Sequence, residues 1–202
     1  MYVYPYREED RVDVLPVSVA NAKEYLYIGA SVTIHDDLIA RLLKAVRNFF
    51  ENATNHYTTE ITFKTYRDSF LDGCYEIRKS PLKSIVSIQY YDSDDNIQTI
   101  NSTNYFIKPM NGYDRVVFKQ DYVFPELSID VGWPIEITFK AGYTDQPNEI
   151  PEDIETAILS HLAMIFENRG DCEVINSSLI KKFVPVTTKL AIKNYKIEEI
   201  GV

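Results

Sequence analysis

The chain has 202 residues, 45% hydrophobic and 25% charged, so it can bury a substantial core and has the composition of a folded soluble protein. Its 21 basic and 30 acidic side chains give a formal net charge of −9, which argues against a protein that wraps nucleic acid. The two cysteines, Cys74 and Cys172, argue against a disulfide framework. No secretory signal or apolar run long enough to span a membrane is present, so we expect synthesis in the cytoplasm.

The first 16 residues mix tyrosines, charges and prolines without a period and predict an extended arm. Ser18 is a plausible N-cap for a short helix that runs to about Tyr27 and ends at Gly29. Asp36 and Asp37 predict the start of a second helix, since carboxylates stabilise the positive end of a helix.

The second helix carries a wide apolar face. Its main stripe and the apolar residues beside it are Leu38, Leu42, Ala45, Phe49 and Ala53, with Ile39, Val46 and Phe50. A face of this width predicts packing on more than one neighbour, either inside the protomer or across a subunit boundary.

The central part of the chain predicts β-strands, because β-branched and aromatic residues alternate with polar ones. The expected strands lie at 61–70, 75–78, 84–92, 104–108, 115–119 and 135–143. Their short connections favour antiparallel pairing. Pro151 then predicts the start of a closing helix whose apolar residues recur at helical spacing up to Gly170. The predicted fold class is α+β: N-terminal helices, a mostly antiparallel β portion, a closing helix and an extended C-terminal tail.

Two parts of this pattern resemble the head–tail connector (adaptor) family of tailed bacteriophages. The first is "VSVANAKEYL" followed by "HDDLIARLLKAVRNFFENAT", and the second is Ala141-Gly142-Tyr143, a polar loop, Ile150-Pro151-Glu152-Asp153 and the ending Glu167-Asn168-Arg169-Gly170. The resemblance covers residues 17–170, which we treat as one connector domain between an arm (1–16) and a tail (171–202).

The resemblance implies a structural subunit of the virion rather than an enzyme. Its expected partners are further copies of itself in a cyclic homo-oligomer, the portal protein, and a stopper or tail-completion protein. DNA would pass through such a ring only as transiting cargo, and no membrane is involved. Two alternatives stay open: a stopper or tail-completion role in the same connector, and a small ligand-binding module or enzyme from a mobile element.

No pattern in the chain predicts catalysis, a cofactor or a metal. His35, His56 and His161 lie in different predicted elements, without the spacing of zinc ligands. The segment Asp92–Asn96 begins like a calcium loop, but Ile97 and Thr103 stand where that loop needs a glycine and an acid. A hairpin turn explains the segment more simply.

The C-terminal tail differs from the body in charge. Residues 181–202 contain five lysines and two glutamates, whereas residues 1–180 contain 16 basic and 28 acidic side chains. Apolar residues scattered among the lysines predict a docking arm that is mobile or extended alone and orders on a partner. The alternative is a strand folded back on the protein's own sheet.

The candidate subunit or portal interface residues are Phe49, Phe50, Arg169, Phe183, Leu190, Tyr195 and Ile197. Arg169 has a second interpretation, a local salt bridge or a favourable charge at a helix C-terminus.

Overall fold

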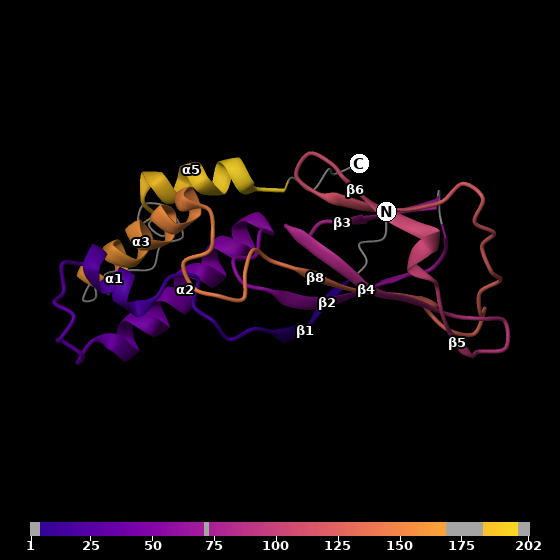
Figure 1. The fold of residues 1–202 in the computed structure, drawn as a ribbon, viewed down its shortest axis with the longest axis horizontal. Helices are drawn as coiled ribbons and strands as arrows, with labels where there is room; N and C mark the ends of the chain where they lie inside the picture. The colour runs from indigo at the N-terminus through magenta and orange to yellow at the C-terminus, as the bar shows by residue number, and fades with distance from the viewer. Residues whose placement is uncertain (1–4, 71–72, 169–183, 198–202) are drawn as a thin grey trace, which may run out of the picture. The chain divides into compact units, whose positions relative to one another are not determined.

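The computed structural model of the protein describes residues 5–70, 73–168 and 184–197. The chain forms two compact units, each assembled from segments that are distant in sequence. The sheet unit takes its described residues from the ranges 1–12, 60–142 and 197–202, and the helical unit from 13–59 and 143–196. Figure 1 shows the helices and strands of each unit.

The described residues of the helical unit form four helices: α1 (Val19–Tyr25), α2 (Asp36–Thr54), α3 (Glu152–Glu167) and α5 (Val186–Tyr195). Ser18 caps α1 as predicted, since its hydroxyl accepts a hydrogen bond from the backbone N–H of Asn21 at 3.1 Å. Asn55 ends α2 in the left-handed conformation that asparagine tolerates. The helix predicted from Asp36 is confirmed as α2, and the closing helix predicted from Pro151 is confirmed as α3.

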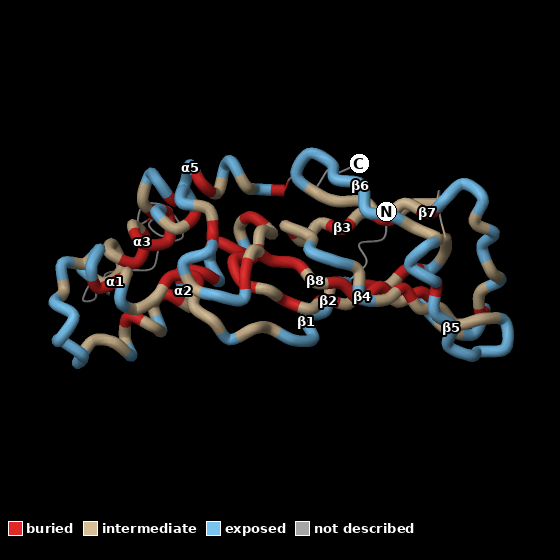
Figure 2. Tube along the Cα trace, in the orientation of Figure 1, coloured by how far each residue is buried: buried red, intermediate tan, exposed pale blue. Residues whose placement is uncertain are grey.

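The core of the helical unit lies between α2 and α3. Its largest fully buried side chains are Phe50, Ile39, Leu43, Ile154, Ile158 and Leu162. Figure 2 shows buried positions, drawn in red, recurring along both helices. The predicted main stripe of α2 is not the buried one, since Ala45 and Phe49 are exposed and its other members are half-buried. The residues predicted beside it, Ile39, Val46 and Phe50, face the core instead.

The sheet unit contains two antiparallel sheets. The larger has the order β1-β2-β8-β4-β5, and the smaller has the order β3-β7-β6. The strands are β1 (Tyr6–Arg11), β2 (Ile61–Arg67), β3 (Cys74–Ile77), β4 (Leu82–Tyr91), β5 (Ile97–Thr99), β6 (Tyr105–Pro109), β7 (Asp114–Phe118) and β8 (Ile135–Ala141). The α+β fold class and the antiparallel pairing are confirmed.

The two sheets contact one another through aromatic and cationic side chains. The Arg67 guanidinium donates a hydrogen bond to the Glu76 carbonyl at 3.2 Å and lies 5.6 Å from the centre of the Tyr75 ring. The Tyr6 hydroxyl donates to the same carbonyl at 3.4 Å. Tyr6 thus fixes β1, an edge strand of the larger sheet, against the first strand of the smaller one.

Both ends of the chain contain regular structure that the sequence analysis did not predict. Residues 6–11 of the expected arm pair with β2 as strand β1. Within the expected tail, Val186–Tyr195 forms helix α5 after Pro185, which occupies the N-cap position. None of the helices in the described part of the chain is long and apolar enough to cross a membrane.

The predicted turn at Asp92–Asn96 is confirmed, and it joins β4 to β5. One carboxylate oxygen of Asp92 accepts hydrogen bonds from the backbone N–H groups of Asp94 at 3.0 Å and Asn96 at 2.9 Å. Its other oxygen accepts from the Gln98 amide at 2.8 Å. Hydrogen bonding to Gln98 and to these N–H groups lowers the pKa of Asp92, so the side chain acts as a local anion that organises the turn.

Replacing Asp92 should destabilise the turn, whereas replacing Asp94 should not. Asp92→Ala removes the two carboxylate oxygens that accept three hydrogen bonds and should lower the melting temperature. Asp94→Asn should change the unfolding free energy by no more than about 0.5 kcal/mol. Thermal melts of the two variants with and without calcium measure both effects. Calcium stabilisation of the wild type that Asp94→Asn abolishes would restore the calcium-loop interpretation.

Candidate interaction surfaces

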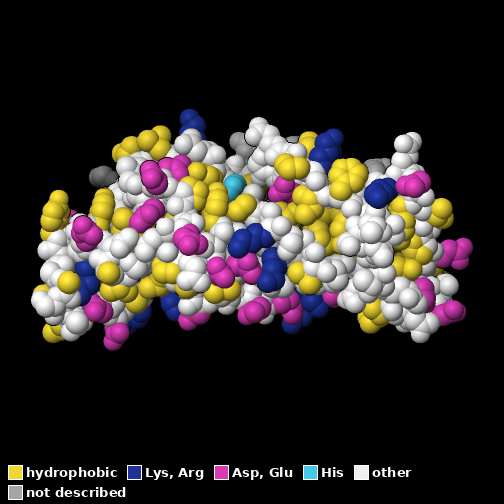
Figure 3. Space-filling model, viewed as in Figure 1, with side chains coloured by type: hydrophobic (Ala, Val, Ile, Leu, Met, Phe, Trp, Pro, Cys, Tyr) yellow, Lys and Arg dark blue, Asp and Glu magenta, His cyan; other side chains and the backbone are white. Residues whose placement is uncertain are grey.

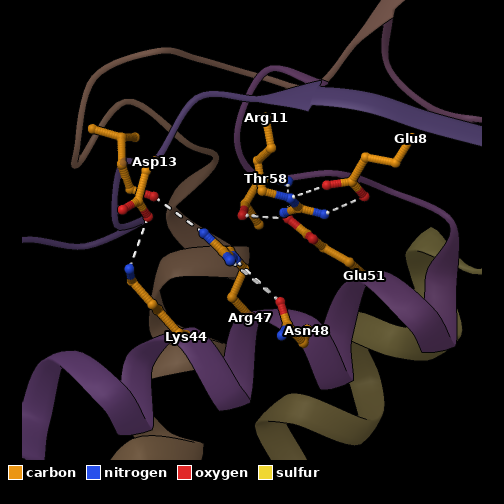
Figure 4. A network of polar contacts seen from close by, with 9 residues as sticks. Glu8, Arg11, Asp13, Lys44, Arg47, Asn48, Glu51 and Thr58 are labelled. Atoms are coloured by element: carbon orange, nitrogen blue, oxygen red, sulfur yellow. Dashed lines mark hydrogen bonds and ion pairs between the residues drawn. The ribbon is translucent and has the colours of Figure 1, made fainter. Parts of the chain in front are cut away.

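Buried polar side chains fasten the segments beside α2 to that helix (Figure 4). Glu51 is 1% exposed and accepts hydrogen bonds from the Thr58 backbone N–H at 2.9 Å and hydroxyl at 2.8 Å. Arg47 is 5% exposed and donates to the Val14 carbonyl at 3.2 Å. Because a buried charge is costly unless it is hydrogen-bonded, these contacts specify how the segment before α1 and the segment after α2 run along that helix.

Lys44 adds a more exposed ion pair to the same face of α2 (Figure 4). Its ammonium group lies 2.8 Å from a carboxylate oxygen of Asp13. The hydrogen bond and charge of Lys44 lower the pKa of Asp13. Solvent screens this pair, so it fixes the path of the chain rather than contributing much stability.

Helix α5 packs on α3 through three hydroxyl contacts. The Thr188 hydroxyl donates to the Ala157 carbonyl at 2.9 Å, and both groups are buried. The Thr187 hydroxyl lies 3.0 Å from the Ser160 hydroxyl, and the Tyr195 hydroxyl donates to an Asp153 carboxylate oxygen at 2.9 Å. The described part of the tail is therefore a helix docked on the protein's own body.

An aromatic cluster surrounds the end of α5. The His56 ring lies 5.2 Å from the Tyr195 ring and 6.5 Å from the Tyr143 ring. Burial lowers the pKa of His56. Burial, together with the nearby Asp153 carboxylate, raises the pKa values of Tyr143 and Tyr195 to about 12. At neutral pH both tyrosines stay protonated, and Tyr195 acts as a hydrogen-bond donor rather than a base.

The chemistry available in this cluster is limited. Burial also lowers the pKa of His161, which packs edge-on against Phe49 with ring centres 5.0 Å apart. Over residues 5–70, 73–168 and 184–197, no group of three or more His, Cys, Asp or Glu side chains could hold a metal ion. His161 is buried and His56, Tyr143 and Tyr195 are partly buried, and their ring and hydrogen-bond contacts fit structural roles in packing.

The predicted interface residues have different positions in the structure. Phe50 and Ile197 are 1% and 6% exposed, so burial within the protomer accounts for their apolar character. Tyr195 is partly buried in the cluster described above. Arg169 and Phe183 lie outside the described residues.

Leu190 and Phe49 are the predicted interface residues with substantial exposure, 55% and 36%. Leu190 lies one turn after Val186, which is 70% exposed, so the two form an apolar stripe on the outer side of α5. Lys189 and Lys193 are exposed on the same helix. We call these four residues the α5 face, an apolar stripe with positive charge beside it.

Other exposed apolar side chains were not identified from the sequence. The most exposed are Tyr27, Ile34, Val123 and Ile129, all above 80%. All four lie in connections between elements, where no period marks them. On the face drawn in Figure 3, hydrophobic side chains are interspersed with acidic and basic ones in both units.

Comparison with known proteins identifies the fold. No family model matches the sequence, and no curated protein matches it. Three solved structures of gene transfer agent (GTA) particles contain chains of similar structure, each 16% identical in sequence, and the similarity covers 98% of both chains. The TM-scores are 0.75 for the neck of an empty particle computed with C6 symmetry, 0.75 for the native virion and 0.74 for the native neck computed with C12 symmetry. At this identity the similarity establishes a shared fold.

His56, which is partly buried, and His161, which is buried, should make the protein less stable in mild acid. Their folded-state pKa values lie below the ordinary value of 6.5, so the unfolded chain binds protons more readily as the pH falls through that value. The unfolding free energy should therefore be greatest above about pH 7 and should be lower at about pH 5.5. Most carboxylates are still ionised at that pH, so the histidines account for the change.

A variant carrying both His56→Gln and His161→Gln should show a flatter pH profile than the wild type in urea titrations. Ser93→Ala, in the exposed turn, is the control and should retain the wild-type profile. An unchanged slope in the double variant would contradict this assignment.

Proposed function

We propose that the protein is a structural subunit of the neck of a phage-like particle, where it forms a head–tail connector ring that docks on the portal. The observation that carries the proposal is the similarity to neck chains over 98% of both chains, at a TM-score of 0.75. The resemblance of residues 17–170 to the adaptor family supports the same position in the particle. The role is structural, with particle assembly rather than a reaction as its output.

A cyclic ring is the expected form of the assembly. The similar chains come from necks computed with C6 and C12 symmetry. A ring of identical subunits needs a heterologous interface, in which one surface of a subunit contacts a different surface of its neighbour. The chain offers exposed apolar side chains in both of its compact units for such an interface.

The charge of the protein suits a ring through which DNA passes. Its net charge of −9 gives little affinity for phosphate groups. A wall that bound phosphates tightly would slow the movement of DNA. The proposed ring therefore continues the channel of the portal with DNA only as cargo.

The α5 face is the surface we propose for the portal. Val186 and Leu190 provide exposed apolar area, and the neighbouring lysines favour encounter with an acidic partner. The hydroxyl contacts of Thr188 and Tyr195 hold the helix in place before binding, which lowers the entropy cost of docking. The described part of the tail thus presents a preformed helix rather than an arm that orders on contact.

Native mass spectrometry and electron microscopy of the protein with and without purified portal test the proposal. We expect a closed cyclic oligomer on the portal, with its pore aligned with the portal channel. A stopper or tail-completion protein would instead bind only a portal already carrying an adaptor. A protein that remains monomeric and does not bind the portal under any condition would contradict the proposal.

Charge introduced on the α5 face should weaken portal binding without unfolding the protein. Leu190→Asp places a carboxylate in the apolar stripe, and we expect at least about tenfold weaker binding by surface plasmon resonance. Val86→Asp, at a site of similar exposure (54% against 55%) on β4, is the matched control and should bind as the wild type does. Deleting the tail is less informative, because α5 covers part of the helical core through Ala191. Undiminished binding by a folded Leu190→Asp variant would exclude the α5 face.

A further inference from the structure

The connection between α1 and α2 carries an exposed apolar surface. Residues 25–34, "YLYIGASVTI", contain no charged side chain, although the protein as a whole is 25% charged. Within this segment Tyr27 is 99% exposed, Ile34 83%, Tyr25 42% and Val32 41%. We call these four side chains and their loop the knob. Several exposed apolar side chains within one short segment indicate an interaction site.

The knob is held in one conformation by a buried lysine. The Lys23 ammonium group is almost fully buried (5% residue exposure), donates to the Ala30 carbonyl at 2.9 Å and lies 3.0 Å from an Asp36 carboxylate oxygen. A backbone hydrogen bond from Val32 to the Gly29 carbonyl at 2.9 Å closes a turn within the loop. Because the buried Lys23 contacts both the loop and the first turn of α2, the loop is ordered before binding. Little conformational entropy is then lost when its apolar side chains bind a partner.

The backbone of the knob begins with the C-terminal cap of α1. Tyr27 has a φ of +56°, and the backbone N–H groups of Tyr27 and Ile28 donate to the carbonyls of Glu24 at 3.1 Å and Lys23 at 2.8 Å. This Schellman-type cap fixes the direction in which the loop leaves the helix, and the Tyr27 side chain remains 99% exposed.

One face of the smaller sheet carries an open groove with a volume of about 470 Å³. Most of its lining is apolar. Cys74, Val117 and Phe106 face one another across the three strands and line it. Arg115 and Lys108 form the next cross-strand pair and line it too.

Charge is complementary between the two surfaces. The knob is flanked by Glu24 and Asp37, which are both exposed, whereas the groove is bordered by Lys108 and Arg115. Arg115 is held in place by Glu76 at 2.6 Å, and its Nε is buried with no hydrogen-bond partner among the described residues. Opposite charges around an apolar contact fix orientation and suppress wrong partners.

We infer that the knob of one subunit inserts into the groove of the next copy of the same chain. The inference rests on the proposed ring and supplies its interface. The apolar side chains of the knob in one subunit contact the apolar groove of the next subunit. The acidic residues around the knob lie near the basic residues around the groove. Because the two surfaces differ, the contact is heterologous and repeats from subunit to subunit, as a ring requires.

Mixing two defective variants tests this arrangement directly. The knob variant carries Tyr27→Asp and Ile34→Asp, and the groove variant carries Phe106→Asp, all at exposed positions. Each variant alone should associate about tenfold or more weaker than the wild type, with and without portal. An equimolar mixture retains one intact knob and one intact groove, so native mass spectrometry should find a heterodimer that does not grow further.

Disulfide cross-linking locates the contact within the assembled ring. Cys74 already lines the groove, and Ala30→Cys adds a thiol to the knob in a Cys172→Ser background. Oxidation should convert the subunits into a ladder of covalent oligomers that Cys74→Ser abolishes. Ser93→Cys, in the exposed turn between β4 and β5, replaces the knob thiol as a control and should give no ladder.

The outcomes separate this inference from the proposed function. If the wild type forms rings while the knob and groove variants assemble equally well and no ladder forms, the interface is elsewhere and the ring proposal stands. If the wild type stays monomeric both at high concentration and on the portal, the ring and the interface are both overturned. Circular dichroism of each variant confirms that lost assembly does not reflect unfolding.

Discussion

Antiparallel pairing of β2 with β8 is the constraint on which both units depend. The pairs run from Ile61 opposite Ala141 to Arg67 opposite Ile135. The chain enters β2 and leaves β8 at the same end of this pair. There Thr59 and Thr144 form an isolated β-bridge, and the Tyr143 N–H donates to the Tyr57 carbonyl at 3.1 Å. The helical unit is made of segments that precede β2 and follow β8, so this pairing brings its two halves together. Pairing β2 with β8 closes a long loop of the chain, which costs conformational entropy. The packing that results from this pairing offsets the cost.

The elements predicted well from the sequence have strong periods and bury one face. Helix α2 alternates buried and exposed positions at helical spacing, and β2 alternates strictly along its length. Helix α5 was missed because its burial is slight, with Thr188 and Ala191 as its buried residues. Its position comes from the contact of Thr188 with a carbonyl 31 residues away, which no local pattern encodes. The division of the strands into two sheets is likewise a property of long-range pairing.

The candidate interface residues show a second limit of sequence reasoning. An apolar residue on a wide helical stripe can face either the core or a partner, and Phe50 faces the core. Leu190 lies on the narrow stripe that it forms with Val186 and is exposed. The knob was missed because it lies between elements, and its uncharged run does not distinguish it, since the uncharged run at 96–107 is longer. Within the loop, Leu26 and Ile28 pack against the core while Tyr27 is exposed, so apolar character alone does not tell which side chains are exposed.

In the proposed ring, the knob belongs to the helical unit and the groove to the sheet unit, and the chain passes between these units at residues 12–13, 59–60, 142–143 and 196–197. A ring closes only when the rotation from each subunit to the next adds up to a full turn. The net charge of −9 on every copy opposes association in dilute solution, since like charges repel over about a Debye length. The apolar contact between knob and groove acts only at short range and must overcome that repulsion. A portal that gathers subunits by their α5 faces raises their local concentration, so ring closure is favoured on the portal and disfavoured in free solution.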